Sequence, residues 1–176
     1  MKKLKVATVW LDGCSGCHMS LLDMDAAIIA VAQKIDLVYG PLVDAQEFPE
    51  GVDVTLVEGA ISSQEDLEKI NKIRQRTTVL VAMGDCAATG NVPAMRNNLQ
   101  VQKLLQRVYV EGSSENKVVP TQGVPPLLKT ARPLREFVKV DLTLPGCPPP
   151  AKMISGVLMA VIEGRKPEMA TAVKFG

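Results

Sequence analysis

The sequence predicts a three-layer α/β domain with a flavodoxin-like parallel sheet of about five strands. Short Val-rich runs bounded by Gly, Pro or Asp recur along the chain, as is typical of strands buried on both faces. Segments with helical periodicity separate these runs, and this alternation favours a parallel sheet covered by helices. The chain has 176 residues, which is most economically one domain, and we expect a single domain over residues 1–176.

The expected strands are short apolar runs at residues 5–11, 37–39, 52–57, 78–83 and 138–144. The first run is interrupted by Lys5 and stops at Asp12, with no small-residue cleavage pattern behind it. It is therefore interpreted as a strand and not as a signal peptide. No apolar run approaches the ~20 residues that a membrane-spanning helix needs.

The expected helices lie between the strands, at residues 19–33, 63–74, 93–110 and 149–163. The second begins with a capping box, in which Ser63 is the N-cap and Asp66 stands where Glu or Gln is usual. Leu67, Ile70 and Ile73 follow at helical spacing. Gly164 is expected to end the last helix.

Residues 111–133 do not fit this rhythm, since they contain four prolines and show little periodicity. Loops longer than about 12–15 residues are usually functional or disordered. The stretch is therefore interpreted either as a long interface loop that binds a partner or as a surface insertion without a role.

The amino-acid composition argues against some classes of protein. The formal net charge is +1 and only 3% of residues are aromatic, so nucleic-acid binding has little support. With four cysteines in a chain of this size, reduced thiols in the cytoplasm are expected rather than a disulfide framework.

All four cysteines lie beside glycine or one residue away from it, and each follows an expected strand. Cys14 and Cys17 come after the first strand, Cys86 follows Gly84-Asp85, and Cys147 follows Gly146. In an open parallel sheet, the loops at the carboxyl ends of the strands share one edge. Four thiolates meeting at that edge would form an iron–sulfur or zinc site.

Three interpretations of the cysteines compete. Structural zinc more often uses two close pairs of ligands, whereas one close pair plus two isolated cysteines suits a cuboidal 4Fe-4S cluster. A thioredoxin-like redox pair at Cys14 and Cys17 would leave Cys86 and Cys147 as unrelated thiols. The spacing favours the cluster and leaves zinc and the redox pair as alternatives.

Other groups are expected at the same edge. Glu58 ends a strand and is either a proton-relay or partner-anchoring carboxylate, or a helix-facing or solvated loop acid. His18 is the only histidine, and Asp12 and Asp85 lie beside the cysteine loops. Cofactor-binding backbone is expected at Gly13, Gly16, Gly59, Gly84 and Gly146. These glycines could also cradle the phosphate of FMN, but no contiguous phosphate loop is present, so a flavin is not indicated.

At these residues the chain resembles the small, electron-transfer subunit of nickel–iron hydrogenases. The resemblance spans residues 6 to about 167 and rests on four motifs in the family's order: Asp12-Gly13-Cys14-Ser15-Gly16-Cys17, Leu56-Val57-Glu58-Gly59-Ala60-Ile61, Gly84-Asp85-Cys86-Ala87-Ala88 and Leu144-Pro145-Gly146-Cys147-Pro148-Pro149. It implies one 4Fe-4S cluster held by Cys14, Cys17, Cys86 and Cys147.

The resemblance also implies partners and a reaction. Hydrogen would be cleaved at a nickel–iron centre on a separate large subunit, and this chain would have no catalytic residue of its own. Diaphorase subunits with FMN and further clusters would then reduce NAD⁺. The chain has no cysteine after Cys147 and no twin-arginine signal, which resembles the short, cytoplasmic NAD-reducing form.

Two departures qualify the resemblance. Many relatives place a Glu soon after the second cysteine, where this chain has His18-Met19-Ser20, so a proton route through such a Glu is not expected. The related cluster subunit of respiratory complex I has two adjacent cysteines in its first loop, whereas two residues separate Cys14 from Cys17. Deazaflavin-linked and other cytoplasmic hydrogenases stay as alternatives beside this complex I subunit.

Overall fold

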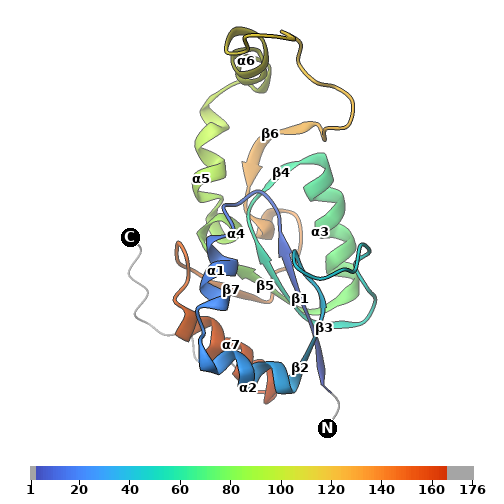
Figure 1. Cartoon of the computed structure of the whole chain (residues 1–176), viewed down its shortest axis with the longest axis vertical. Coiled ribbons are helices and arrows are strands. Elements are labelled where there is room, and N and C mark those ends of the chain that lie inside the picture. Colours follow the sequence, from blue (N-terminus) through green and yellow to red (C-terminus); the bar gives the residue numbers. More distant parts are fainter. Residues whose placement is uncertain (1–2, 166–176) are drawn as a thin grey trace.

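The computed structural model describes residues 3–165 and places a five-stranded sheet at the centre of the molecule (Figure 1). The strand order is β2-β1-β3-β5-β7, and every neighbouring pair is parallel. The strands are β1 (Leu4–Trp10), β2 (Ile35–Tyr39), β3 (Val52–Glu58), β5 (Thr77–Met83) and β7 (Leu142–Leu144). The predicted α/β class and the parallel sheet of five strands are confirmed.

Helices cover both faces of this sheet. The longer ones are α1 (Gly16–Leu22), α2 (Ala26–Lys34), α3 (Gln64–Arg76) and α7 (Ala151–Ile162). Ile70 and Ile73 of α3 belong to the core on one face, whereas Val31 of α2 and Ile154 of α7 belong to the core on the other. Figure 1 shows the strands between α3 on one side and the group formed by α1, α2 and α7 on the other.

Shorter elements lie between β5 and β7. They are α4 (Asp85–Thr89), α5 (Asn91–Ala94), the 3₁₀ helix η1 (Met95–Asn98), α6 (Val101–Gln106), the π-helical turn η2 (Arg107–Glu111) and the 3₁₀ helix η3 (Leu134–Glu136). The single helix predicted for residues 93–110 is therefore wrong, because extended backbone at Leu99 and Gln100 separates η1 from α6.

The helix predicted for residues 19–33 is also divided, into α1 and α2. Asp25 adopts a positive φ of 52° between them, which few residues other than Gly, Asn and Asp tolerate. The capping box of α3 is confirmed: the Asp66 N–H donates to Ser63 Oγ at 3.1 Å, and the Ser63 N–H donates to Asp66 Oδ2 at 2.9 Å.

A second sheet was not predicted from the sequence. Strand β4 (Ile61–Ser63) pairs antiparallel with β6 (Leu127–Arg132), which lies inside the segment expected to be a loop over residues 111–133. Within this segment, residues 112–126 and Pro133 lie outside helices and strands. The pairing joins segments more than 60 residues apart, so local patterns did not reveal it.

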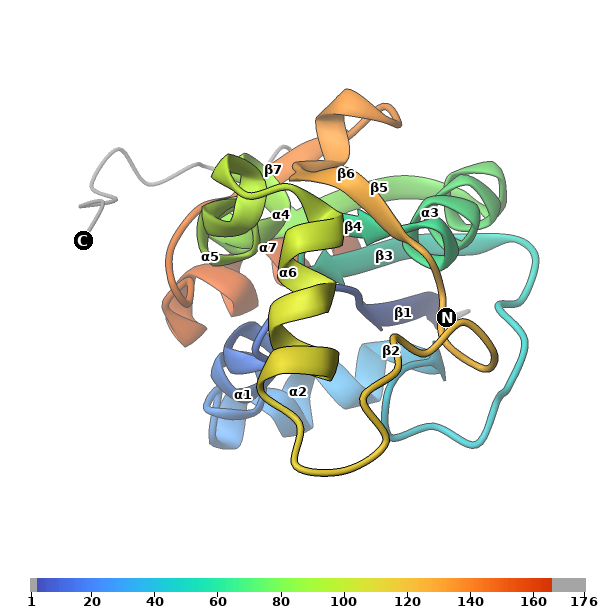
Figure 2. The same cartoon turned by 90° about the horizontal axis from the view of Figure 1, so that it is seen from above.

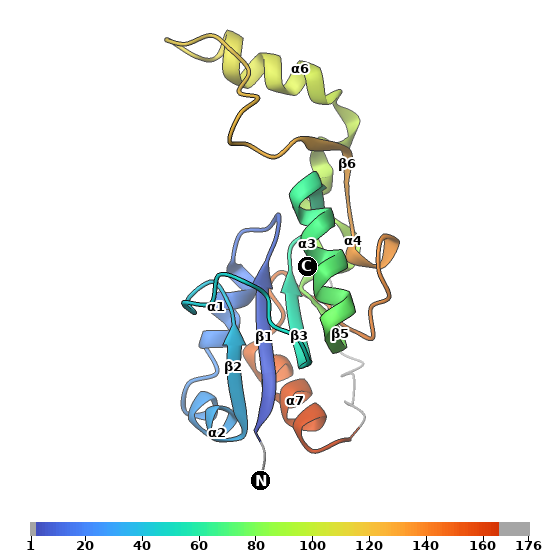
Figure 3. The same cartoon turned by 90° about the vertical axis from the view of Figure 1, so that its right-hand side faces the viewer.

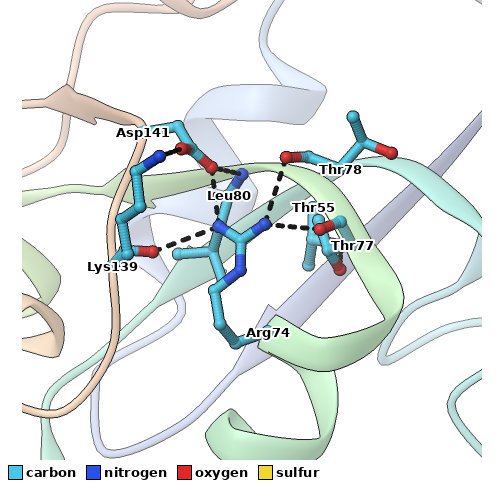
Figure 4. Close-up of polar contacts among 7 residues, drawn as sticks. All are labelled: Thr55, Arg74, Thr77, Thr78, Leu80, Lys139 and Asp141. Carbon is cyan, nitrogen blue, oxygen red and sulfur yellow. Dashed lines mark hydrogen bonds and ion pairs between the residues drawn. The ribbon is translucent and has the colours of Figure 1, made fainter.

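Arg74, near the end of α3, links three parts of the fold on the side away from the cysteines (Figure 4). Its guanidinium donates to the carbonyls of Thr77, Thr78 and Lys139, the last two at 3.1 Å, and to Asp141 Oδ2 at 2.6 Å. Arg74 therefore joins the end of α3 to the start of β5 and to the turn before β7.

Asp141 completes this network. Its Oδ2 accepts the Leu80 N–H of β5 at 2.9 Å. Burial alone would raise the pKa of Asp141, but the Leu80 N–H and Arg74 outweigh burial and hold this pKa below its ordinary value of 3.8. A carboxylate with a lowered pKa stabilises the fold above its unfolded pKa, and this contribution is lost as the pH falls through the folded value.

We expect Arg74→Ala to lower the free energy of unfolding by about 2 kcal/mol, because Asp141 and three carbonyls lose a charged donor. Urea unfolding at neutral pH measures this, and the loss should shrink as the pH falls from about 4 through the lowered pKa of folded Asp141. Arg107→Ala is the control: Arg107 is 78% exposed and pairs only with Glu111, so its loss should cost at most about 0.5 kcal/mol. Equal effects of the two substitutions would contradict the role of Arg74.

Among residues 3–165, no helix is long and apolar enough to cross a membrane.

Candidate metal centre

The loops that follow β1 and β3 are bonded to each other. The Leu11 N–H donates to the Glu58 carbonyl at 2.9 Å, and Asp12 and Ala60 exchange two backbone hydrogen bonds. Gly59 lies between them with a φ of 96°, and a Cβ there would come within 2.8 Å of the Leu11 backbone. Only glycine allows the two backbones to come this close. The close approach places the loop that carries Cys14 and Cys17 against the end of β3.

The loops that follow β5 and β7 are joined by Asp85. The Asp85 N–H donates to the Gly146 carbonyl at 2.9 Å, and the Gly146 N–H donates to Asp85 Oδ1 at 2.7 Å. The Gly84 N–H also donates to the Leu144 carbonyl at 2.7 Å. Because Cys86 and Cys147 each follow these bonded residues directly, the two isolated cysteines are held side by side.

Gly84 connects the two halves of the site. Its φ is 87°, and a Cβ at this position would overlap the sulfur of Cys17. The other three thiols lie close enough to Cys17 to raise its pKa. The structure therefore brings all four predicted cysteines to one edge of the sheet, with Gly84 in the space beside the most buried of them.

The four thiols differ in exposure. Cys17 is buried, Cys86 is half-buried, and Cys14 and Cys147 are exposed. Burial, and to a smaller extent Glu58 and the neighbouring thiols, together raise the pKa of Cys17 to about 12. Burial also raises the pKa of Cys86. Since a metal binds thiolate and not thiol, a bound group has to supply the positive charge that stabilises these buried sulfurs.

The arrangement fits a cluster better than a single ion. Sulfurs that bind one zinc at ~2.3 Å lie within ~4.6 Å of each other. In the described part of the chain, which includes all four cysteines, no group of three or more His, Cys, Asp or Glu side chains is placed to hold one metal ion. A 4Fe-4S cluster instead takes four thiolates, each on its own iron, so their sulfurs are spaced more widely.

Glu58 is buried at the end of β3, with 1% of its side chain exposed. Its Oε2 lies 2.5 Å from His18 Nδ1 and accepts the His18 N–H at 3.2 Å. The interpretation of Glu58 as a solvated acid is therefore wrong, whereas a helix-facing acid agrees with its contacts, because His18 belongs to α1. The other ring nitrogen of His18, Nε2, is buried and has no hydrogen-bond partner within residues 3–165.

One further contact was not predicted. Ser20 Oγ, on α1, donates to the Pro149 carbonyl at 2.5 Å. It ties the helix after Cys17 to the chain just beyond Cys147. A lone serine in an apolar helical stretch gives no sequence signal for such a bond, and the role of Asp85 in joining two loops was equally unmarked.

The model of the protein family described as NADH ubiquinone oxidoreductase, 20 Kd subunit, matches residues 14–161. The chain belongs to this family. The matched range runs from the first cysteine past the last one, so it contains all four cysteines and Glu58.

Similar curated proteins in this family include hydrogenase subunits. They confirm the resemblance to the small subunit of nickel–iron hydrogenases that the four motifs indicated. The chain is 41% identical over 172 residues to a subunit of the vhu F420-non-reducing hydrogenase of Methanocaldococcus jannaschii, covering 97% of this chain and 60% of the relative. It is 35% identical over 176 residues to the NAD-reducing hydrogenase HoxS subunit delta of Cupriavidus necator, covering 97% of this chain and 84% of the relative.

A solved structure agrees with these relatives. A chain in the crystal structure of an NAD⁺-reducing [NiFe]-hydrogenase in the H2-reduced state matches with a TM-score of 0.94 and 36% identity, covering 99% of this chain and 100% of that one. A [NiFeSe]-hydrogenase chain matches with a TM-score of 0.64 and 23% identity, which shows the shared fold alone. The chain spans about 60% of the length of the vhu hydrogenase relatives from Methanocaldococcus jannaschii and Methanococcus voltae.

Proposed function

We propose that this chain is the electron-transfer small subunit of a nickel–iron hydrogenase. It relays electrons through one 4Fe-4S cluster between a nickel–iron site on a large partner subunit and NAD-reducing diaphorase subunits that carry FMN and further clusters. The observation that carries the proposal is the convergence of Cys14, Cys17, Cys86 and Cys147 at one sheet edge, with Gly84 leaving room beside Cys17.

The residues of this chain contribute position and environment. Bonds between the loops, through Asp85 and the pair Asp12–Ala60, fix the relative positions of the four thiols. Burial of Cys17 lowers the local dielectric, and backbone N–H groups of the glycine-rich loops are available to sulfur. When bound, a 4Fe-4S cluster supplies one-electron redox chemistry whose potential depends on these features.

The NAD-linked form is supported by two similarities. The chain is 35% identical to the NAD-reducing HoxS subunit delta, and it matches the chain from the NAD⁺-reducing enzyme with a TM-score of 0.94. A cytoplasmic location fits this proposal, because NAD⁺ and reduced thiols are both found there. The second candidate is a hydrogenase small subunit with another acceptor, and an acceptor assay with NAD⁺ and F420 separates the two.

A single substitution in the assembled complex tests the relay. We expect Cys17→Ala to abolish most H₂-dependent NAD⁺ reduction while leaving NADH-to-dye activity close to wild type, because the diaphorase subunits carry their own flavin and clusters. The NADH–dye assay is thus the internal control for an intact complex. If both activities fall equally in a complex of full composition, the proposed electron path is wrong.

We also propose Glu58 as a proton-relay carboxylate, because it is buried beside the site and bonded to His18. Gln keeps an acceptor for the two His18 donors but cannot exchange a proton at neutral pH. Glu58→Gln should therefore slow H₂ turnover while the cluster signal in low-temperature electron paramagnetic resonance is unchanged. Wild-type turnover, or a changed cluster signal, would count against a relay.

A further inference from the structure

Residues 95–132, here called the basic arm, extend away from the central sheet. The arm comprises η1, α6, η2, the segment 112–126 and β6. Figures 1 and 3 show α6 at the far end of the long axis from the N-terminus and α2. In Figure 2, which looks onto this end, α6 lies in front of the sheet.

The arm concentrates the positive charge of the chain. It has six Lys or Arg residues and two Glu, a net charge of +4, whereas the whole chain has +1. Arg107 pairs with Glu111, and Arg132 pairs with Glu136 outside the arm. For Lys103, Lys117 and Lys129, residues 3–165 supply no carboxylate within ion-pair distance.

Apolar side chains are exposed among these charges. The exposed fractions are 57% for Leu99, 53% for Val108, 40% for Tyr109, 71% for Val118 and 45% for Val124. Apolar area ringed by charge is typical of a protein interface. The arm has a single aromatic residue on which a base could stack, so single-stranded nucleic acid is disfavoured.

The base of the arm is held in place. The Asn97 side chain donates to the Ala131 carbonyl at 2.8 Å and accepts the Ala131 N–H at 2.7 Å. Arg96 donates to the carbonyls of Ser62 and Leu128 at 3.0 and 3.1 Å. A groove of about 540 Å³ runs between residues 97–102 and β6, with Lys129 on its wall. The base of the arm, with η1, β6 and the groove between them, is therefore a formed surface.

The arm also adjoins the cysteine edge. Its β6 pairs with β4, which begins two residues after Gly59, and its helices follow the Cys86 loop through α4 and α5. A subunit that sits over the cysteine loops would therefore be flanked by the arm. We propose that the basic arm clamps the nickel–iron large subunit by binding an acidic, partly apolar surface of it. This inference rests on the proposed function, which names that partner.

Neutralising the three lysines tests the clamp. The variant Lys103→Gln/Lys117→Gln/Lys129→Gln is compared with Lys3→Gln/Lys34→Gln/Lys139→Gln, which removes three lysines preceding β1, β2 and β7 at the opposite edge of the sheet. Each is purified as a complex with the large subunit, and the apparent Kd is measured from dissociation on dilution. Iron content and thermal unfolding are recorded to show that the variants are folded and loaded.

In about 0.1 M NaCl, we expect the arm variant to raise the Kd about tenfold and the control to stay within about twofold of wild type. In about 1 M NaCl, where charges are screened beyond ~3 Å, wild type and arm variant should converge. An unchanged Kd for the arm variant would overturn the clamp alone. The clamp would also be overturned if the arm variant kept the wild-type Kd for the large subunit but lost binding to phosphatidylserine vesicles or to DNA, because the arm would then serve another partner. A wild-type chain that forms no complex with the large subunit would overturn the proposed function and, with it, this partner.

Discussion

Replacing Cys86 or Cys147 by Ser in the assembled complex is expected to remove most of the cluster iron. Each cysteine is the only one on its loop, so no neighbouring thiol can substitute for it. A serine hydroxyl is a poor replacement for thiolate, and the lost ligand leaves an open coordination position. Iron and sulfide analysis and low-temperature electron paramagnetic resonance of the reduced complex measure the loss.

The matched control is Ser114→Ala, an exposed change within residues 112–126, which should keep full iron content. Wild-type iron and sulfide in both cysteine variants would refute the assignment of four cysteine ligands. A loss in one variant alone would assign the remaining cysteine to another role.

Gly84→Ala is expected to have an effect nearly as large, although no ligand is removed. The methyl group would overlap the Cys17 sulfur, and the residue would also have to adopt a φ of 87°. The second cost alone is about 1–3 kcal/mol for a residue with a Cβ, because a φ of 87° with a ψ of 165° is adopted almost only by glycine. The overlap adds displacement of Cys17, so we expect loss of cluster iron together with a lower unfolding temperature.

Gly51→Ala separates the two causes. Gly51 has a φ of 65°, but a Cβ there meets nothing within 4 Å. It should therefore show only the backbone cost, with full iron content in the complex. If Gly84→Ala retains iron as Gly51→Ala does, the space beside Cys17 is not needed for the cofactor.

Much of the fold could be predicted because its signals are local. Strands β1, β3 and β5 are short runs rich in apolar residues, and the capping pair Ser63 and Asp66 marks the start of α3. The pairing of β4 with β6 has no such signal, because β4 has three residues and its partner lies more than 60 residues away. The break between α1 and α2 depends on one unusual backbone conformation at Asp25.

The candidate centre likewise has features that the sequence predicted and features that it did not. Parallel strands place the loops after them at one edge, so the topology alone predicted that Cys14, Cys17, Cys86 and Cys147 would meet. The groups that set their spacing are side chains bonded across loops, such as Asp85 to Gly146 and Ser20 to Pro149. Such bonds depend on three-dimensional packing, so their sequence positions carry no warning of them.

The order of the ligand loops along the chain has a consequence for biogenesis. Cys14 follows the first strand of the sheet and Cys147 follows the last, so the sheet has to be complete before all four thiols share one edge. During synthesis on the ribosome, the loop with Cys14 and Cys17 therefore waits until β7 and Cys147 have emerged. The proposed cluster, bound to Cys14 and Cys147, would close a loop of more than 100 residues, which removes about 4–5 kcal/mol of unfolded-chain entropy. Insertion of this cluster would then follow folding and would lock the first strand of the sheet to the last.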